Sequence, residues 1–270
     1  MTANASTLDF STVEGDWVSV TELPFGVSRV RAQRVGPVLV VNAHGAGGPV
    51  YGDWGTAEAN GIFVMQSGAG IVFTAEFDGE TVCSQLQSYR ALGVLAVHVF
   101  HRFIDGSGRR DFFTREHYVR AEGRRSQPTR PRLTSPVAGE GFPAELLAGE
   151  HDASALLDTW LPVDPPAKGI ARLVITQSDD SVTVRAQGVG AADAGGPATV
   201  DWGEAIAHVY SDVTNPEGPP AILTTFDHGD RLVHLEIRQY LGTLIVGEYV
   251  EFTDGAGRSD YFIREVYVHE

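Results

Sequence analysis

The residues best suited to chemistry occur in a motif that the chain contains twice. The motif is Arg-Glu-x-Tyr, with its glutamates at Glu116 and Glu265 and its tyrosines at Tyr118 and Tyr267. Successive side chains of a strand point to opposite faces, so each glutamate shares a face with the tyrosine two residues later. If the protein is an enzyme, these four residues and His98 could donate or accept protons in an enclosed space. The same pairs could instead close the fold through a structural hydrogen bond.

A second repeated motif, Asp-Trp-Gly, places Trp54 and Trp202 after Gly-Gly-Pro in each half. An indole at the mouth of a barrel can stack on a ligand. Alternatively, the aspartate caps a short helix and the tryptophan plugs the core. Arg238 alternates with His234 and Glu236 along one strand face, which is either a polar lumen or a solvated surface. The other candidate ligand-binding residues are Phe73, Phe100, Phe112, Tyr249 and Tyr261.

The sequence predicts no metal site and no cofactor. The acidic turns at 105–111 and 254–260 offer fewer oxygens than the six to eight that Ca²⁺ requires, and they indicate hairpins. His98 and His101 are three residues apart and face opposite sides of a strand. Cys83, the only cysteine, has no neighbouring base, which favours an inert buried thiol. Phosphate loops, dinucleotide fingerprints and zinc-protease motifs are absent from the sequence.

The elements that must position these residues are duplicated. Residues 93–119 match residues 242–268 at a constant offset of 149, with 14 of the 27 positions identical. A unit of about 110 residues is too long for a solenoid repeat and suits a domain with its own core. We predict a first repeat over 1–121, an Arg- and Pro-rich linker over 122–142, and a second repeat over 143–270.

Each repeat is typical of an all-β fold. Runs rich in Val, Ile, Thr, Phe and Tyr are separated by turns that contain Gly, Asp or Pro. This even spacing favours an antiparallel meander that closes into an up-and-down barrel. We also predict a helix over 143–160 and a short helix after each Asp-Trp-Gly motif.

One further pairing resembles a known superfamily. Each repeat has a tryptophan near its start, Trp17 and Trp160, and an arginine in its last strand, Arg115 and Arg264. This arrangement resembles the calycin pattern of lipocalins and avidins, in which an early tryptophan packs beneath an arginine from the last strand. The resemblance implies two tandem calycin-like barrels, each closed at one end by a guanidinium over an indole.

Composition limits the partners. The formal net charge is −15, and residues 143–270 contribute 21 acidic against 7 basic side chains. This half would repel a polyanion, so nucleic acid is not an expected partner. Apolar runs are too short for a membrane helix, and the first residues lack the pattern of a secretion signal. We expect a cytoplasmic protein with no membrane partner.

The sequence therefore predicts a tandem barrel that binds a small, largely apolar molecule in one or both lumens. One alternative is a cyclase or isomerase that confines a hydrophobic substrate. Another is a tandem carbohydrate-binding module, which requires Trp54 and Trp202 to be exposed. Self-association through the repeats is also left open.

Overall fold

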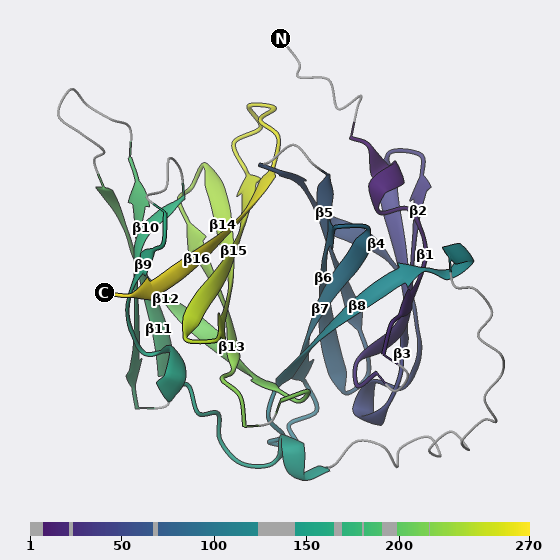
Figure 1. The fold of residues 1–270 in the computed structure, drawn as a ribbon, viewed down its shortest axis with the longest axis horizontal. Helices are drawn as coiled ribbons and strands as arrows, with labels where there is room; N and C mark the ends of the chain where they lie inside the picture. Colours follow the sequence, from purple (N-terminus) through teal and green to yellow (C-terminus); the bar gives the residue numbers. More distant parts are fainter. Residues whose placement is uncertain are drawn as a thin grey trace. The chain divides into compact units, whose positions relative to one another are not determined.

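The computed structural model describes residues 8–21, 24–66, 70–123, 144–164, 169–179, 181–190, 199–215 and 217–270. It is all-β, with 66% strand against 6% helix, and the described residues contain no helix of seven or more residues. This confirms the all-β part of the predicted fold class. The chain divides into two compact units: the first comprises Asn4–Glu150 and Asp212–Pro216, and the second is formed mainly by His151–Ser211 and Glu217–Glu270. Figure 1 shows the strands that make up the two units.

The first unit contains eight strands that pair in sequence order and return to the start. They are β1 (Gly15–Ser19), β2 (Val27–Val35), β3 (Val38–Gly45), β4 (Gly52–Met65), β5 (Ile71–Asp78), β6 (Val82–Ala91), β7 (Val94–Phe103) and β8 (Phe112–Arg120). All consecutive pairs are antiparallel. Strand β8 also pairs with β1, where Arg120 lies opposite Trp17. The eight strands therefore form a closed ring, which leaves no unpaired sheet edge between them.

The second unit repeats this pattern. Its strands are β9 (Asp158–Pro162), β10 (Ile170–Ser178), β11 (Ser181–Val189), β12 (Thr199–Asp212), β13 (Ala221–Asp227), β14 (Arg231–Tyr240), β15 (Thr243–Phe252) and β16 (Tyr261–His269). They also pair in order and antiparallel. The ring closes through β16 and β9, where His269 lies opposite Trp160.

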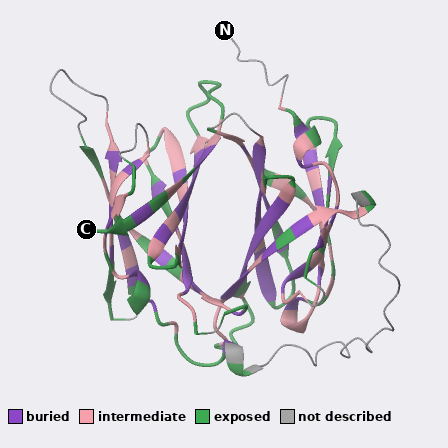
Figure 2. Ribbon diagram, in the orientation of Figure 1, coloured by how far each residue is buried: buried purple, intermediate pink, exposed green. Residues whose placement is uncertain are grey.

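Side chains that alternate along the strands fill the interior of each ring. Strand β3 shows the pattern clearly, because Leu39, Val41 and Ala43 are buried and alternate with half-buried neighbours. In the first unit these residues join a cluster that contains Trp17, Phe73, Leu86 and Tyr118. An equivalent cluster surrounds Trp160 in the second unit, and buried residues follow the strands of both units (Figure 2). Period-two alternation thus places one face of each strand in a core.

The group that covers each early tryptophan differs from the prediction. The guanidinium of Arg120, not that of Arg115, lies 4.9 Å from the Trp17 ring. In the second unit the ring of His269, 3.7 Å from that of Trp160, takes this place. Arg115 and Arg264 are wrong as closing residues because they lie an odd number of residues from Tyr118 and Tyr267, and therefore on the other strand face.

The predicted helices are also corrected. The segments after the Asp-Trp-Gly motifs continue β4 and β12, and each motif forms a β-bulge where the register shifts. Gly55 and Gly203 have φ angles of +78° and +82° there, a conformation that favours glycine. The predicted helix over 143–160 is reduced to the 3₁₀ turns η5 (Ala144–Leu147) and η6 (Ser154–Leu156), followed by β9. The other 3₁₀ turns are η2 (Phe10–Thr12), η3 (Gly48–Val50) and η4 (Ala121–Gly123). Most of the predicted linker, residues 124–142, lies outside the described residues.

We predict that Trp17→Ala lowers the free energy of unfolding of the first unit by about 3–5 kcal/mol, because it empties a fully buried site. Arg120→Gln removes the contact with the indole and the hydrogen bond to the Ser11 carbonyl, and should cost only about 1–2 kcal/mol. Denaturant unfolding of both variants measures the difference. Equal losses would contradict a core role for Trp17.

Candidate functional site

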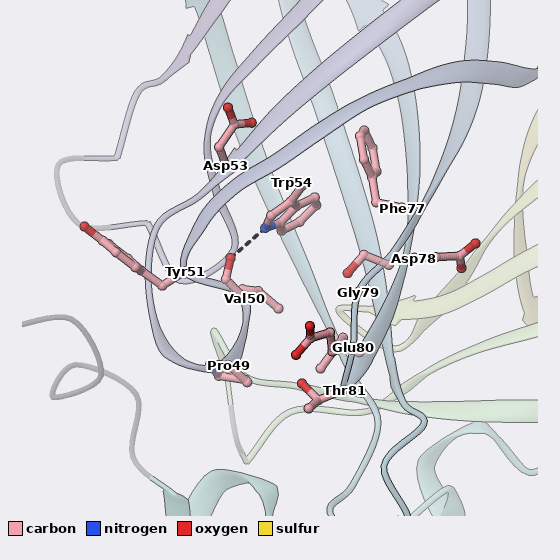
Figure 3. A pocket seen from close by; sticks show the side chains of 12 residues that line it. Pro49, Val50, Tyr51, Asp53, Trp54, Phe77, Asp78, Gly79, Glu80 and Thr81 are labelled. Carbon is pink, nitrogen blue, oxygen red and sulfur yellow. Dashed lines mark hydrogen bonds between the residues drawn. The ribbon is translucent and has the colours of Figure 1, made fainter.

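A pocket of about 290 Å³ lies in the first unit beside Trp54. Its apolar walls come from the turn that precedes β4 and from the ends of β5 and β6 (Figure 3). The lining residues are Pro49, Val50, Tyr51, Asp53, Trp54, Phe77, Asp78, Gly79, Glu80, Thr81, Val82 and Ser84. The pocket therefore combines aromatic and aliphatic walls with hydroxyl and carboxylate groups.

Local contacts hold the Trp54 indole in a fixed position. Its Nε1 donates a hydrogen bond to the Val50 carbonyl at 2.6 Å (Figure 3). The ring meets Phe77 edge to face at 5.5 Å between centroids. Only glycine fits at position 45, since a Cβ there would lie 1.6 Å from the Val50 oxygen and 2.6 Å from Trp54 Nε1. The close packing of turn and strand thus presents one indole face as a rigid wall.

A buried polar pair lies at the inner end of the pocket. The Ser84 hydroxyl, on a pocket-lining residue, is 2.8 Å from Nδ1 of His101. The imidazole also meets Trp54 edge to face at 5.6 Å and stacks on Phe112 at 4.4 Å. Burial lowers the pKa of His101 to about 3, so the ring is neutral at physiological pH. Ser84 and His101 were not predicted from the sequence to form a site together. The feature that could have indicated them is a polar residue at a core-facing position of each strand.

The rim of the pocket is acidic. Asp53, Asp78 and Glu80 line it, and none of its described lining residues is Lys, Arg or His. Asp53 accepts hydrogen bonds from the Gly55 backbone and the Asn42 side chain, which lower the pKa of its carboxyl. Figure 3 shows the Glu80 carboxylate turned toward the pocket and that of Asp78 turned away. The rim therefore disfavours an anion at the entrance.

The equivalent region of the second unit has different chemistry. Trp202 is held between Phe226 and His228, whose rings lie 5.7 and 5.0 Å away. His228 stands where the first unit has Gly79, at the offset of 149 residues. Ser84 and His101 are replaced by Val233 and Val250, which face each other across β14 and β15. The second unit thus has an imidazole beside its tryptophan and an apolar pair beneath it.

The predicted Glu-Tyr pairs fasten the last strand of each ring to the second. Tyr118 donates a hydrogen bond to the Val27 carbonyl, and Glu116 accepts one from the Gly26 backbone N–H at 3.3 Å. Desolvation raises the pKa of Glu116. In the second unit the Tyr267 hydroxyl lies 3.0 Å from both the Ile170 carbonyl and the Glu265 carboxylate. Both arrangements satisfy main-chain groups at the start of β2 or β10.

Glu248 is a buried acid that sequence reasoning did not identify. Its side chain is only 1% exposed and replaces Val99 of the first unit. Neither carboxyl oxygen has a partner in hydrogen-bonding geometry among the described residues, although the Tyr267 hydroxyl and the Ile170 backbone lie nearby. Burial, and then the charge of Glu265, raise its pKa to about 8. The available signal was a glutamate among the core-facing residues of β15, between Val246 and Val250.

The structure separates the other predicted residues into two groups. Phe73 belongs to the first core cluster, Phe112 packs near the pocket, and Tyr261 packs against the second core cluster. The second group alternates with core residues along the strands and therefore lies on the opposite strand face. Its members are His98, Phe100, Arg238 and Tyr249. On that face Arg238 Nε lies 3.6 Å from the Glu236 carboxylate, which also accepts a hydrogen bond from Tyr249 at 3.4 Å. Of the predicted residues, only Trp54 and Phe112 come together with the Ser84–His101 pair.

Two groups of acidic residues have simpler explanations than a metal. Ligand atoms of Glu76, Asp78 and Cys83 lie within 4.8 Å of one another. However, the thiol donates a hydrogen bond to Glu76, and burial with these carboxylates raises its pKa to about 12. Asp105 is bound by the Ser107 backbone and the Arg109 guanidinium, as in a hairpin turn. These contacts favour a protonated thiol and an ordinary turn.

Comparison with known proteins identifies no relative: no family model matches the chain, and no curated protein matches it. Within the described residues, no helix is both long and apolar enough to cross a membrane. Function must therefore be inferred from the geometry of the site.

We predict that Glu248→Val changes the pH dependence of stability. The pKa of Glu248 is raised from its ordinary value of 4.5 to about 8 in the folded state, so the folded protein holds this proton more tightly than the unfolded chain does. The resulting contribution to the free energy of unfolding is fully present below about pH 4.5. This contribution is lost as the pH rises to about 8. The variant should therefore be more stable than the parent at pH 8.5, with a flatter profile between pH 5 and 8.5.

Denaturant unfolding across this pH range provides the measurement. Glu204→Gln, a change at an exposed glutamate of the same unit, serves as the control and should leave the profile unchanged. A Glu248→Val profile that parallels the parent would show that Glu248 is ionised in the folded protein.

Proposed function

We propose that each half of the chain is a calycin-like barrel and that the first binds a small, largely apolar molecule beside Trp54. The observation that carries this proposal is the pocket of about 290 Å³ with Trp54 and Phe77 in its walls. Ligand pockets commonly span about 300–1,000 Å³, so this size suits a molecule of one or two rings. The ring closure and the covered early tryptophans support the calycin-like interpretation.

The proposal places the ligand at the end of the ring and not in its middle. The core cluster, which includes Phe73, Leu86 and Val99, occupies the interior of the first ring. The pocket begins at the edge of this cluster, where Phe77, one of its members, and Val82 line it. A ligand there would gain apolar contact without displacing the side chains that hold the ring together.

The two alternatives receive less support from the geometry. A tandem carbohydrate-binding module needs an exposed indole face in both repeats, whereas Trp202 is half-buried and packed against Phe226 and His228. An enzyme that uses Glu116 or Glu265 would need these carboxylates to be accessible. Their bonds to Gly26 and to Tyr267 instead support a structural role.

We predict that α-methylstyrene, a neutral aromatic probe, binds to the protein and that Trp54→Ala weakens binding at least tenfold. Removal of the indole deletes an aromatic wall whose contact contributes about 1.5–3 kcal/mol. Saturation-transfer NMR of the probe can measure the affinity in every variant.

Trp202→Ala is the matched control, because it removes the same residue from the same motif of the second repeat. It should destabilise the protein to a similar degree and leave the affinity unchanged. If Trp54→Ala fails to fold, Trp54→Leu keeps an apolar side chain and still removes the aromatic wall. Equal affinities in the parent and a folded Trp54 variant would refute the site.

A further inference from the structure

We propose that Ser84 and His101 form the specificity-determining floor of the pocket and donate a hydrogen bond to an acceptor atom of a neutral ligand. The ligand class is a ring-sized apolar molecule with one carbonyl or ether oxygen and no negative charge. This inference rests on the proposed function and defines what the same pocket accepts.

The placement of the two residues supports this role. Ser84 and His101 lie directly opposite each other on β6 and β7, and both are buried. Ser84 lines the pocket, while His101 lies behind it in contact with Trp54 and Phe112. The floor thus offers one polar group, fixed in position, beside the aromatic walls formed by Trp54 and Phe77.

The hydrogen bonding of His101 determines which partner donates. Nε2 of His101 has no hydrogen-bond partner among the described residues. An orphaned N–H in a core is rarer than an unsatisfied acceptor, so the proton of the neutral ring belongs on Nδ1. Nδ1–H then donates to the Ser84 oxygen across 2.8 Å. This arrangement leaves the Ser84 hydroxyl proton available to an acceptor in the pocket.

The second repeat shows that the fold does not require this pair. The same register positions of β14 and β15 hold Val233 opposite Val250. Two valines fill this layer without a buried polar group, whereas His101 is fully buried with an unsatisfied nitrogen. An incompletely satisfied polar group lowers stability relative to an apolar one. A pair that the fold can replace with valines, and that costs stability, is best explained by a role in binding.

The rim limits the charge of the ligand. Glu80 is turned toward the pocket (Figure 3), and Asp53 and Asp78 also line it. A carboxylate ligand would meet this negative rim before it reached a floor that offers only a neutral donor. A carbonyl compound meets no such repulsion and can direct its oxygen to Ser84.

The test compares two isosteric probes, acetophenone and α-methylstyrene, in which C=O is exchanged for C=CH₂, with benzoate as the anion. The key variant is the double substitution Ser84→Val and His101→Val, which copies the second repeat. Thr114→Val, at a buried position that does not line the pocket, is the control. Saturation-transfer NMR gives the Kd of each probe, and denaturant unfolding gives the stability of each variant.

We expect the ratio of the α-methylstyrene Kd to the acetophenone Kd to fall at least tenfold in the double variant, because its floor leaves the ketone oxygen unpaired. Ser84→Ala should lower the ratio similarly, and Thr114→Val should leave it unchanged. The double variant should be at least as stable as the parent, and benzoate should bind more weakly than either neutral probe.

The outcomes separate this inference from the proposed function. If both neutral probes bind but their ratio stays within twofold in the double variant, the polar floor is refuted and the apolar pocket is retained. If neither probe binds the parent protein, the proposed function fails. Tight binding of benzoate would overturn the assigned ligand charge.

Discussion

Closure of each ring by a short first strand is the constraint on which the other features depend. Strand β1 has five residues, yet it places Trp17 in the core and pairs with β8. The Tyr118 hydroxyl reinforces this closure by donating to the Val27 carbonyl on β2. Tyr267 makes the equivalent bond to Ile170. Backbone pairing joins the last strand to the first, and a side chain joins it to the second. The paired strands therefore surround the interior of each ring without a gap between the last strand and the first.

Both repeats share this closure. Positions at which the residue differs between the two repeats therefore show which substitutions the fold accommodates. The covering group changes from Arg120 to His269 without loss of the buried tryptophan. Interior positions change more strongly, since Val99 corresponds to Glu248 and the Ser84–His101 pair corresponds to two valines. Each repeat thus contains a costly polar group at a position that the other fills with an apolar one. These positions are therefore where the interior chemistry of the two repeats differs most.

The sequence predicted the features that depend on local pattern. The duplication, the all-β class and the strand face shared by Glu116 and Tyr118 all follow from residue type and period two. The helices after Asp-Trp-Gly were wrong because positive φ at Gly55 and Gly203 allows a bulge inside a continuing strand. The closing arginine was wrong because only strand pairing reveals that position 120 lies beside Trp17. The Ser84–His101 pair was missed because its residues contact each other only when β6 and β7 align.

The proposed polar floor would allow a small pocket to discriminate between ligands. In the proposed site, a ligand that covers the Ser84 hydroxyl takes away any hydrogen bond that this group makes to solvent. A purely apolar molecule removes that bond and offers none in return, whereas a carbonyl compound restores it. Discrimination therefore comes mainly from the penalty on the wrong ligand and less from added affinity for the right one. Val233 and Val250 offer no hydrogen-bond donor at the equivalent positions, so the proposed polar selectivity is confined to the first repeat.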